Sequence, residues 1–178
     1  MSWMRIAFIV PVLGAIGCTP APQVPITVQW NDAAAQEVRT QVEATMDAFV
    51  AMDVERFKAG LTQDVVAFEM DLENKLVRFG SRDEVVHWAE ATFAEVKKMN
   101  ASLKLDIHSS NCQATQTLAY CTVEFDFMAK MADGSTMSQP SRNSVVLRKG
   151  DDGWKWTHWH SSAPAPALAV SPPAPTQK

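Results

Sequence analysis

The sequence predicts an α+β fold, a cone-shaped roll in which a long N-terminal helix and two shorter helices pack on a curved, mainly antiparallel sheet. Helical apolar spacing in the first half and strand-like alternation in the second half point to this class. A 178-residue chain with 47% hydrophobic and 20% charged residues is also typical of a globular protein with one substantial core. We therefore expect a single folded domain over residues 31–162.

The first helix is expected after Asn31 and Asp32, either of which can cap it. Apolar side chains then recur at helical spacing, at Val38, Val42, Met46 and Phe49. A second, short helix is expected over residues 54–61, after which the chain turns back.

Two strands should follow over residues 64–71 and 75–80, around the polar turn "LENK". A third helix should begin after Ser81, because Ser81 and Glu84 have the spacing of a capping box. Its buried stripe is predicted to be Val85, Trp88 or Ala89, Thr92, Phe93 and Val96.

The rest of the domain reads as antiparallel strands over residues 102–110, 117–130, 144–149 and 154–162. The breaks "ADG" and "KGDDG" supply the glycines that hairpin turns need. Within 117–130, apolar residues alternate with polar ones, so one face of the sheet should pack on the helices.

The N-terminal residues resemble a bacterial lipoprotein signal. A positive charge at Arg5 precedes the twelve-residue apolar run "IAFIVPVLGAIG", which is too short to span a bilayer and ends directly before Cys18. The resemblance implies a signal peptide over residues 1–17 and lipidation of Cys18; an ordinary signal peptide or a weak membrane anchor is the alternative. Thr19, in place of Asp, implies outer-membrane sorting in a Gram-negative cell.

We accordingly expect a lipid-anchored protein of the cell envelope, on the periplasmic face of the outer membrane. Residues 18–30 read as an extended tether because prolines interrupt them, and the Pro/Ala-rich residues 163–178 read as a disordered tail. The net charge of −4 gives no reason to expect nucleic acid as a partner.

Cys112 and Cys121 flank a hairpin with its turn near residues 115–118, which places them directly opposite each other. Such opposed residues approach closely enough for a disulfide, and export would permit oxidation. Two buried free thiols are the alternative.

Three passages in order resemble the nuclear transport factor two-like superfamily, and within it the SnoaL-like branch and the association domain of calcium/calmodulin-dependent protein kinase. They are "FVAMDVERFKAGLTQDVVAFE", "VRFGSRDEVVHW" and "WKWTHWHSSAPAP", and the resemblance covers about residues 32–166. It implies a fold that hosts enzymes, binding modules and oligomerisation domains alike.

Ketosteroid isomerisation is the superfamily's best-known chemistry, and its general base corresponds here to Asp71, with Glu69 on the same side of the strand. The oxyanion donors are missing, because Thr45 occupies the position of the family's tyrosine. Val145 or Ser144 replaces its protonated aspartate. The chain's single tyrosine, Tyr120, lies elsewhere. Asp71 is therefore also readable as a solvated carboxylate beside a turn.

The kinase association domain presents arginines into its pocket, and the matching positions here hold Thr122 and Ser144. Arg142 and Arg148 share strand parity with Ser144 and could substitute. An anion pocket of that type is therefore not predicted.

On the last strand, simple alternation places Trp154, Trp156, His158 and His160 on one side and Lys155, Thr157, Trp159 and Ser161 on the other. The two histidines could act as zinc ligands with a third from Glu124, Asp126 or His108, or serve as hydrogen-bonded wall residues. We favour the wall residues and expect no metal and no cofactor.

The leading hypothesis is an exported accessory module that binds a small, apolar ligand without catalysis, and we expect a homodimer. One alternative is an isomerase, cyclase or hydratase with Asp71 as base and His158 or His160 as proton donor. The other is a homodimeric assembly module. The candidate pocket-lining residues are Glu69, Trp88, Tyr120, Trp156 and Arg142.

Overall fold

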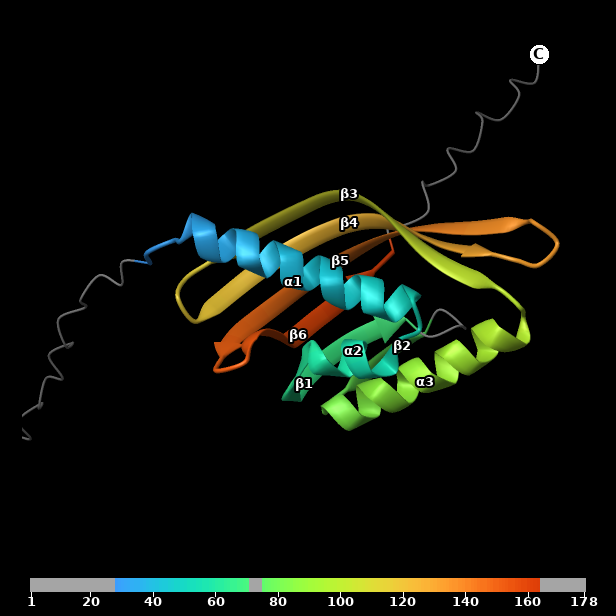
Figure 1. The fold of residues 1–178 in the computed structure, drawn as a ribbon, viewed down its shortest axis with the longest axis horizontal. Helices are drawn as coiled ribbons and strands as arrows, with labels where there is room; N and C mark the ends of the chain where they lie inside the picture. The colour runs from blue at the N-terminus through green and yellow to red at the C-terminus, as the bar shows by residue number, and fades with distance from the viewer. Residues whose placement is uncertain (1–27, 71–74, 164–178) are drawn as a thin grey trace, which may run out of the picture.

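A computed structural model describes residues 28–70 and 75–163, and in them the helices lie on one side of a curved sheet (Figure 1). The predicted α+β class is confirmed. The helices are α1 (Asp32–Val50), α2 (Val54–Ala59) and α3 (Arg82–Lys98). The strands are β1 (Leu61–Met70), β2 (Leu76–Phe79), β3 (Ser102–Ala114), β4 (Leu118–Lys130), β5 (Thr136–Gly150) and β6 (Gly153–Ser162).

The six strands form one sheet in the order β2-β1-β6-β5-β4-β3. All neighbouring pairs are antiparallel except β1 and β6, which run parallel. Helix α1 crosses the part of the sheet made by β3, β4 and β6, whereas α3 covers β1 and β2 (Figure 1). The opposite face of the sheet carries no helix in the described part of the chain. We call these the helix face and the open face.

Each helix begins at a polar residue that caps its first turn. Asn31 Oδ1 accepts a hydrogen bond from Ala34 N (3.0 Å), and Ser81 Oγ accepts one from Glu84 N (3.3 Å). Both expected caps are therefore present. The capping box at Ser81 is incomplete, because Glu84 Oε2 accepts its bond from Gly80 N (2.8 Å) instead.

Helices α1 and α3 end in the same backbone motif. Met52 follows α1 with φ of 55°, and Asn100 follows α3 with φ of 49°. Ala101 N donates to Val96 O (3.1 Å) and Asn100 N donates to Lys97 O (3.0 Å), which is the Schellman pattern of hydrogen bonds. The last carbonyl groups of α3 are thereby satisfied and the chain reverses into β3.

Strand β5 is longer than the sequence indicated, since it begins at Thr136 instead of Ser144. Its first half is polar and contains Pro140, which argues against a central strand. The pairing with β6 starts only at Arg142, opposite Ser162. Pro140 therefore lies where β5 has β4 as its only described partner, and an edge position of this kind tolerates proline.

The core lies between α1, α3 and the helix face of the sheet. The expected apolar face of α1 is buried at Val38, Val42 and Met46, while Phe49 is half-buried. In α3 the fully buried stripe is Val85, Ala89, Phe93 and Val96, so Ala89 and not Trp88 occupies the deep position. Trp88 is half-buried at the edge of this core.

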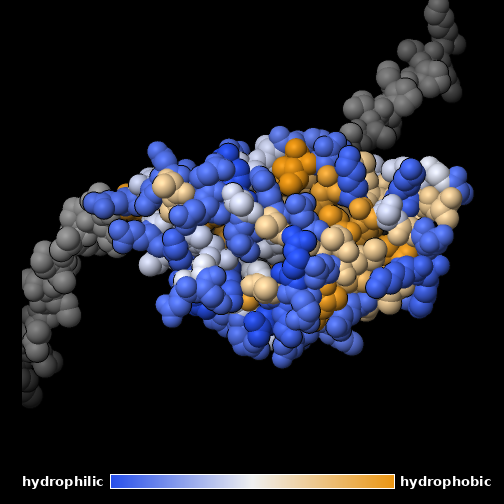
Figure 2. Space-filling model, viewed as in Figure 1, coloured by the Kyte–Doolittle hydropathy of each residue, from blue (hydrophilic) through white to orange (hydrophobic). Residues whose placement is uncertain are grey.

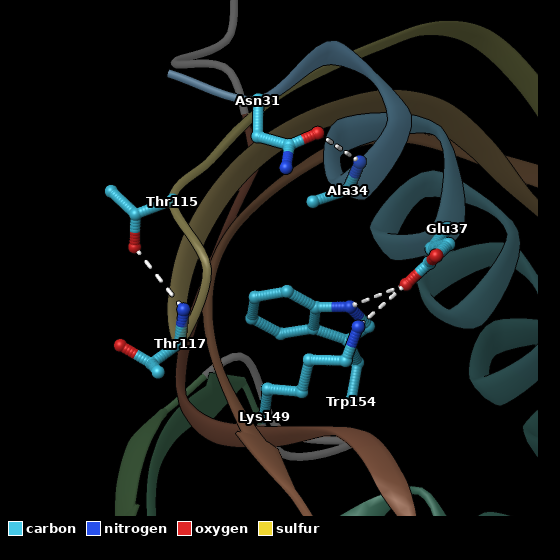
Figure 3. Close-up of polar contacts among 7 residues, drawn as sticks. All are labelled: Asn31, Ala34, Glu37, Thr115, Thr117, Lys149 and Trp154. Atoms are coloured by element: carbon cyan, nitrogen blue, oxygen red, sulfur yellow. Dashed lines mark hydrogen bonds and ion pairs between the residues drawn. The ribbon is translucent and has the colours of Figure 1, made fainter. Parts of the chain in front are cut away.

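A polar cluster around Glu37 links α1 to the sheet at one end of the domain (Figure 3). Glu37 Oε2 accepts hydrogen bonds from Lys149 Nζ (2.9 Å) and Trp154 Nε1 (3.2 Å). Lys149 Nζ also lies 5.4 Å from the centroid of the Trp154 ring. These contacts join α1 to the hairpin of β5 and β6.

The expected signal peptide, Cys18, Asp71 and nearly all of the Pro/Ala-rich tail lie outside the described residues. Among the helices that are described, none combines the length and the apolar character needed to cross a bilayer.

Candidate functional site

The face on which each β6 side chain lies differs from the simple alternation predicted above. Val146 of β5 pairs with His158, but Leu147 pairs with Trp156, so Thr157 is an extra residue that forms a β-bulge. Trp154, Trp156, Trp159 and Ser161 are all buried on the helix face. The prediction that His158 and His160 share a side with Trp154 and Trp156 is therefore wrong, because the bulge reverses the parity after Thr157.

The bulge brings four polar side-chain groups together on the helix face. Glu69 Oε2 accepts hydrogen bonds from Trp159 Nε1 (3.1 Å) and from Ser161 Oγ (2.5 Å). The Ser161 hydroxyl also lies 2.7 Å from Asn143 Oδ1, so its proton is shared between two acceptors. Asn143 and Ser161 are buried, whereas Glu69 is half-exposed. We call this group the Glu69 cluster.

Aromatic rings of the helices pack next to the Glu69 cluster. Phe57 of α2 makes an edge contact with Trp159, their centroids 6.5 Å apart. Phe49 of α1 contacts Phe57 at 5.4 Å and stacks on Trp88 of α3 at 5.5 Å. A carboxylate thus lies at one end of a continuous layer of aromatic rings.

Part of this aromatic layer reaches the surface. Figure 2 shows an apolar area on the helix face, between the C-terminal end of α1, α3 and β3, with hydrophilic surface around it. Half-buried apolar side chains packed against the core at this end of the domain include Phe49, Met52, Trp88, Leu105 and Phe127. The Glu69 cluster and this apolar area form the candidate binding site.

His158 and His160 lie on the open face, on the other side of the sheet from the Glu69 cluster. Both rings make edge contacts with Phe68 of β1, at centroid distances of 5.9 and 6.3 Å. The sheet therefore separates the histidines from the carboxylate of Glu69. Direct proton transfer between them is not available in this arrangement.

Arg142 and Tyr120 also lie on the open face. Arg142 is exposed and forms an ion pair with Glu124 (3.2 Å between Nη2 and Oε1). Both residues line an open pocket of about 250 Å³, together with His108, Asp126 and Ser162 among others. Tyr120 is 45% exposed and lines a different pocket, beside edge strand β3.

Within the described residues, the side chains at the positions of the superfamily's oxyanion groups form no hydrogen bond with the Glu69 cluster. Thr45 is buried and its hydroxyl donates to Gln41 O (2.9 Å) within α1. Val145 is fully buried on the helix face, while Ser144 pairs with His160. Thr122 lines the pocket beside β3.

Cys112 and Cys121 are directly paired across β3 and β4, and the structure joins their sulfurs in a disulfide. Cys121 is fully buried, so the bridge faces the core beneath α1. The described residues contain no group of three or more His, Cys, Asp or Glu side chains that could hold a metal ion. His108 Nε2 lies 3.2 Å from Asp126 Oδ2, and in the described residues it forms no ion pair with Glu124.

Sequence reasoning identified Glu69 and Trp88 but did not assign Asn143, Trp159 and Ser161 to the site. Their roles depend on the bulge at Thr157, and no local pattern in "WKWTHWHSS" predicts this bulge. Trp156, a pocket candidate, is 3% exposed and belongs to the core, with an indole Nε1 that has no described hydrogen-bond partner.

Comparison with protein families gives a match to the SnoaL-like domain over residues 38–166. No curated protein matches the chain. Solved structures share the fold at low identity. An NTF2-like protein of unknown function from Pseudomonas putida is 20% identical, with a TM-score of 0.66 and coverage of 79% of this chain and 93% of that one.

Two further structures carry functional names. A protein of the NTF2-like family from Streptomyces avermitilis, provisionally named a dehydratase, is 16% identical, with a TM-score of 0.65 and coverage of 75% and 97%. The association domain of C. elegans CaMKII is 14% identical, with a TM-score of 0.59 and coverage of 74% and 97%. At these identities the likeness concerns the fold alone.

Proposed function

The chain belongs to the SnoaL-like domain family, and from that premise we propose that it binds a small, mainly apolar molecule on its helix face without transforming it. One observation carries the proposal. The carboxylate of Glu69 is held in place by Trp159 and Ser161 at the end of an aromatic layer, while His158 and His160 project from the opposite face. Among residues 28–70 and 75–163, recognition groups are present there without an adjacent acid–base pair.

The chemistry of the cluster indicates the class of ligand. A carboxylate beside aromatic rings attracts a hydrogen-bond donor or a cationic group, and the rings favour an apolar or aromatic body. The same carboxylate repels an anion. We therefore expect an apolar molecule that carries a hydroxyl or amino group, oriented with that group toward Glu69.

Isothermal titration calorimetry with two matched probes tests this proposal. 2-Naphthol carries a donor and 2-naphthoate carries a negative charge on the same ring system. We expect 2-naphthol to bind and 2-naphthoate to bind more weakly. Glu69→Gln should weaken 2-naphthol binding by about tenfold, as expected for loss of a hydrogen bond to a charged group.

Glu90→Gln is the matched control, because Glu90 is an exposed residue of α3 outside the cluster. It should leave both affinities unchanged. Equal binding of the two probes, or equal effects of the two variants, would show that Glu69 does not select the ligand. Detectable turnover of a small substrate that is lost in Asp71→Asn would overturn the non-catalytic part of the proposal.

The same proposal places the protein in the cell envelope, attached to the outer membrane through a lipid on Cys18. The lipoprotein-like residues 1–18 support it, and a disulfide between Cys112 and Cys121 suits an oxidising compartment. Metabolic labelling with a palmitate analogue, followed by membrane fractionation, tests it. Wild type should carry the label in the membrane fraction and Cys18→Ser should not; label retained by that variant would refute attachment at Cys18.

Homodimerisation through the open face is a second candidate function, and a specific observation favours it. Phe68, Val66 and Val146 are half-buried on this helix-free face, beside His158 and His160. The likeness to an association domain is consistent with assembly. Sedimentation analysis should find a dimer for wild type and a monomer for Phe68→Asp. Exposed Met99→Asp is the control, because Met99 caps the end of α3 on the helix side of the sheet. A wild-type monomer at high concentration would remove this function.

A further inference from the structure

Arg39 of α1 is half-buried. Its Nε is buried and has no hydrogen-bond partner, and within residues 28–70 and 75–163 no ion pair involves its guanidinium. Glu43, which lies one helical turn further along α1, is not within ion-pair distance. Burying an arginine nitrogen without a partner is costly, so the site favours a group that would accept its hydrogen bonds.

The surroundings of Arg39 form a pocket beside edge strand β3. The pocket has a volume of about 330 Å³. Its other lining residues are Asn111, Cys112, Gln113, Tyr120 and Thr122. They come from β3 and β4, and the register pairs Asn111 with Thr122 and Gln113 with Tyr120. Side chains from two strands and one helix are therefore brought together by the fold.

The lining offers hydrogen-bond donors and no negative charge. Asn111 and Gln113 each have an amide NH₂, and Tyr120 and Thr122 each have a hydroxyl. Cys112 is bonded to Cys121, so it contributes no ionisable thiol. The guanidinium is the one charged group of this lining, and its planar fork matches the two oxygens of a carboxylate or phosphate.

We propose that this pocket binds a small oxyanion, a phosphate or carboxylate group, with Arg39 as its principal ligand. The bound oxygens would accept from the Arg39 guanidinium and from the amide and hydroxyl groups of β3 and β4. This site is separate from the Glu69 cluster, because Tyr120 and Thr122 alternate with the buried Cys121 and Val123 of β4. Its charge preference is also opposite to that of the Glu69 cluster.

Nuclear magnetic resonance of the ¹⁵N-labelled, oxidised domain tests the proposal, with inorganic phosphate and succinate as separate probes. The Nε–Hε signal of Arg39 should shift in a saturable manner with at least one of them. Arg39→Gln should weaken binding by about tenfold or more, which corresponds to loss of a charge-assisted hydrogen bond. Arg56→Gln is the matched control, since Arg56 lies on α2 and pairs with Asp53.

A second variant keeps the test decisive if Arg39→Gln disturbs folding. Asn111→Asp changes an exposed residue and places a carboxylate in the lining of the same pocket. It should abolish anion binding while the unfolding temperature stays near that of wild type. Binding that survives in Asn111→Asp, shifts that map away from β3, or no saturable shift with either probe would each overturn the proposal. A response to phosphate alone or to succinate alone would identify the preferred group.

Discussion

Trp156 and Trp159 are three residues apart on one strand, and yet they lie on the same face of the sheet with ring centroids 5.5 Å apart. In a regular strand, residues at this spacing point to opposite faces. The extra residue Thr157 resolves the contradiction by shifting the register between β5 and β6. Because the bulge absorbs this residue, Trp159 is buried beside Glu69, and His158 and His160 lie on the open face.

Deleting Thr157 should be tolerated, because the bulge serves only to accommodate this extra residue. Without it, Trp156, His158 and Trp159 would follow one another in regular alternation, and each side chain would keep its present face. We therefore expect the deletion to cost no more than about 1–2 kcal/mol of unfolding free energy. Trp159→Ala, which removes a buried ring, should cost about 3–5 kcal/mol. Urea unfolding followed by circular dichroism measures both, and a deletion as costly as Trp159→Ala would contradict this account of the bulge.

The fold class followed from signals that are local in sequence. Asn31 and Ser81 mark helix starts, Gly134 and Gly153 mark hairpin turns, and alternation in β4 indicates its buried face. The structure confirms each of them. Such signals were sufficient because the backbone conformation at a cap or a tight turn is set by a few neighbouring residues.

The candidate site was less predictable because it depends on contacts between distant strands. The Glu69 cluster joins β1, β5 and β6, and its formation requires the parallel pairing of β1 with β6 as well as the bulge. Neither feature has a signature within "WKWTHWHSS". The pocket at Arg39 likewise requires a helix residue to meet an edge strand about 70 residues later in the chain.

The Glu37 cluster predicts a pH-dependent contribution to stability. The hydrogen bond from Lys149, then that from Trp154, lowers the pKa of Glu37 below its ordinary value of 4.5. A carboxylate with a lowered folded-state pKa adds stability above the unfolded value, and this stability is lost as the pH falls through the folded value. Glu37→Gln should therefore lower the urea midpoint at neutral pH, with the difference from wild type shrinking below pH 4.5.

Glu43→Gln provides the control for that experiment. Glu43 lies on the same helix and takes no part in the hydrogen bonds of the cluster, so its variant should follow the wild-type profile. A Glu37→Gln deficit that stays constant at all pH values would show that the charge of Glu37 is unimportant. High salt should reduce the deficit, because the cluster is exposed to solvent.

The disulfide between β3 and β4 predicts sensitivity to reductant. Cys112 and Cys121 are separated by nine positions, and closing a loop of this size in the unfolded chain is worth about 2–3 kcal/mol. Dithiothreitol, or the double change Cys112→Ala/Cys121→Ala, should lower the unfolding free energy by this amount. Cys18→Ser should leave the unfolding free energy unchanged. Unchanged stability under full reduction would indicate that the two cysteines are not bonded in solution.

The end of α3 offers a stabilising substitution. Asn100 is exposed and adopts a positive φ, a conformation that glycine takes without steric cost. Asn100→Gly should leave stability unchanged or raise it by up to about 0.5 kcal/mol, whereas Asn100→Ala should lower it by about 1 kcal/mol. Thermal unfolding of the two variants distinguishes them. An alanine variant as stable as the glycine variant would rule out a left-handed residue at this position.

Gly60 and Thr45 provide the last test, because their packing explains why the family's tyrosine position does not belong to the site here. A Cβ built on Gly60 would lie 2.9 Å from Thr45 Cγ2 and also against Thr45 Oγ1, closer than such atoms pack. Gly60→Ala should therefore cost about 1–3 kcal/mol as overpacking. Thr45→Ala removes both contacting atoms, so the Gly60→Ala penalty should fall below about 1 kcal/mol in that background. A double-mutant cycle in urea measures the coupling. Additive losses would mean that the two residues do not contact, and that Thr45 is free to face another part of the domain.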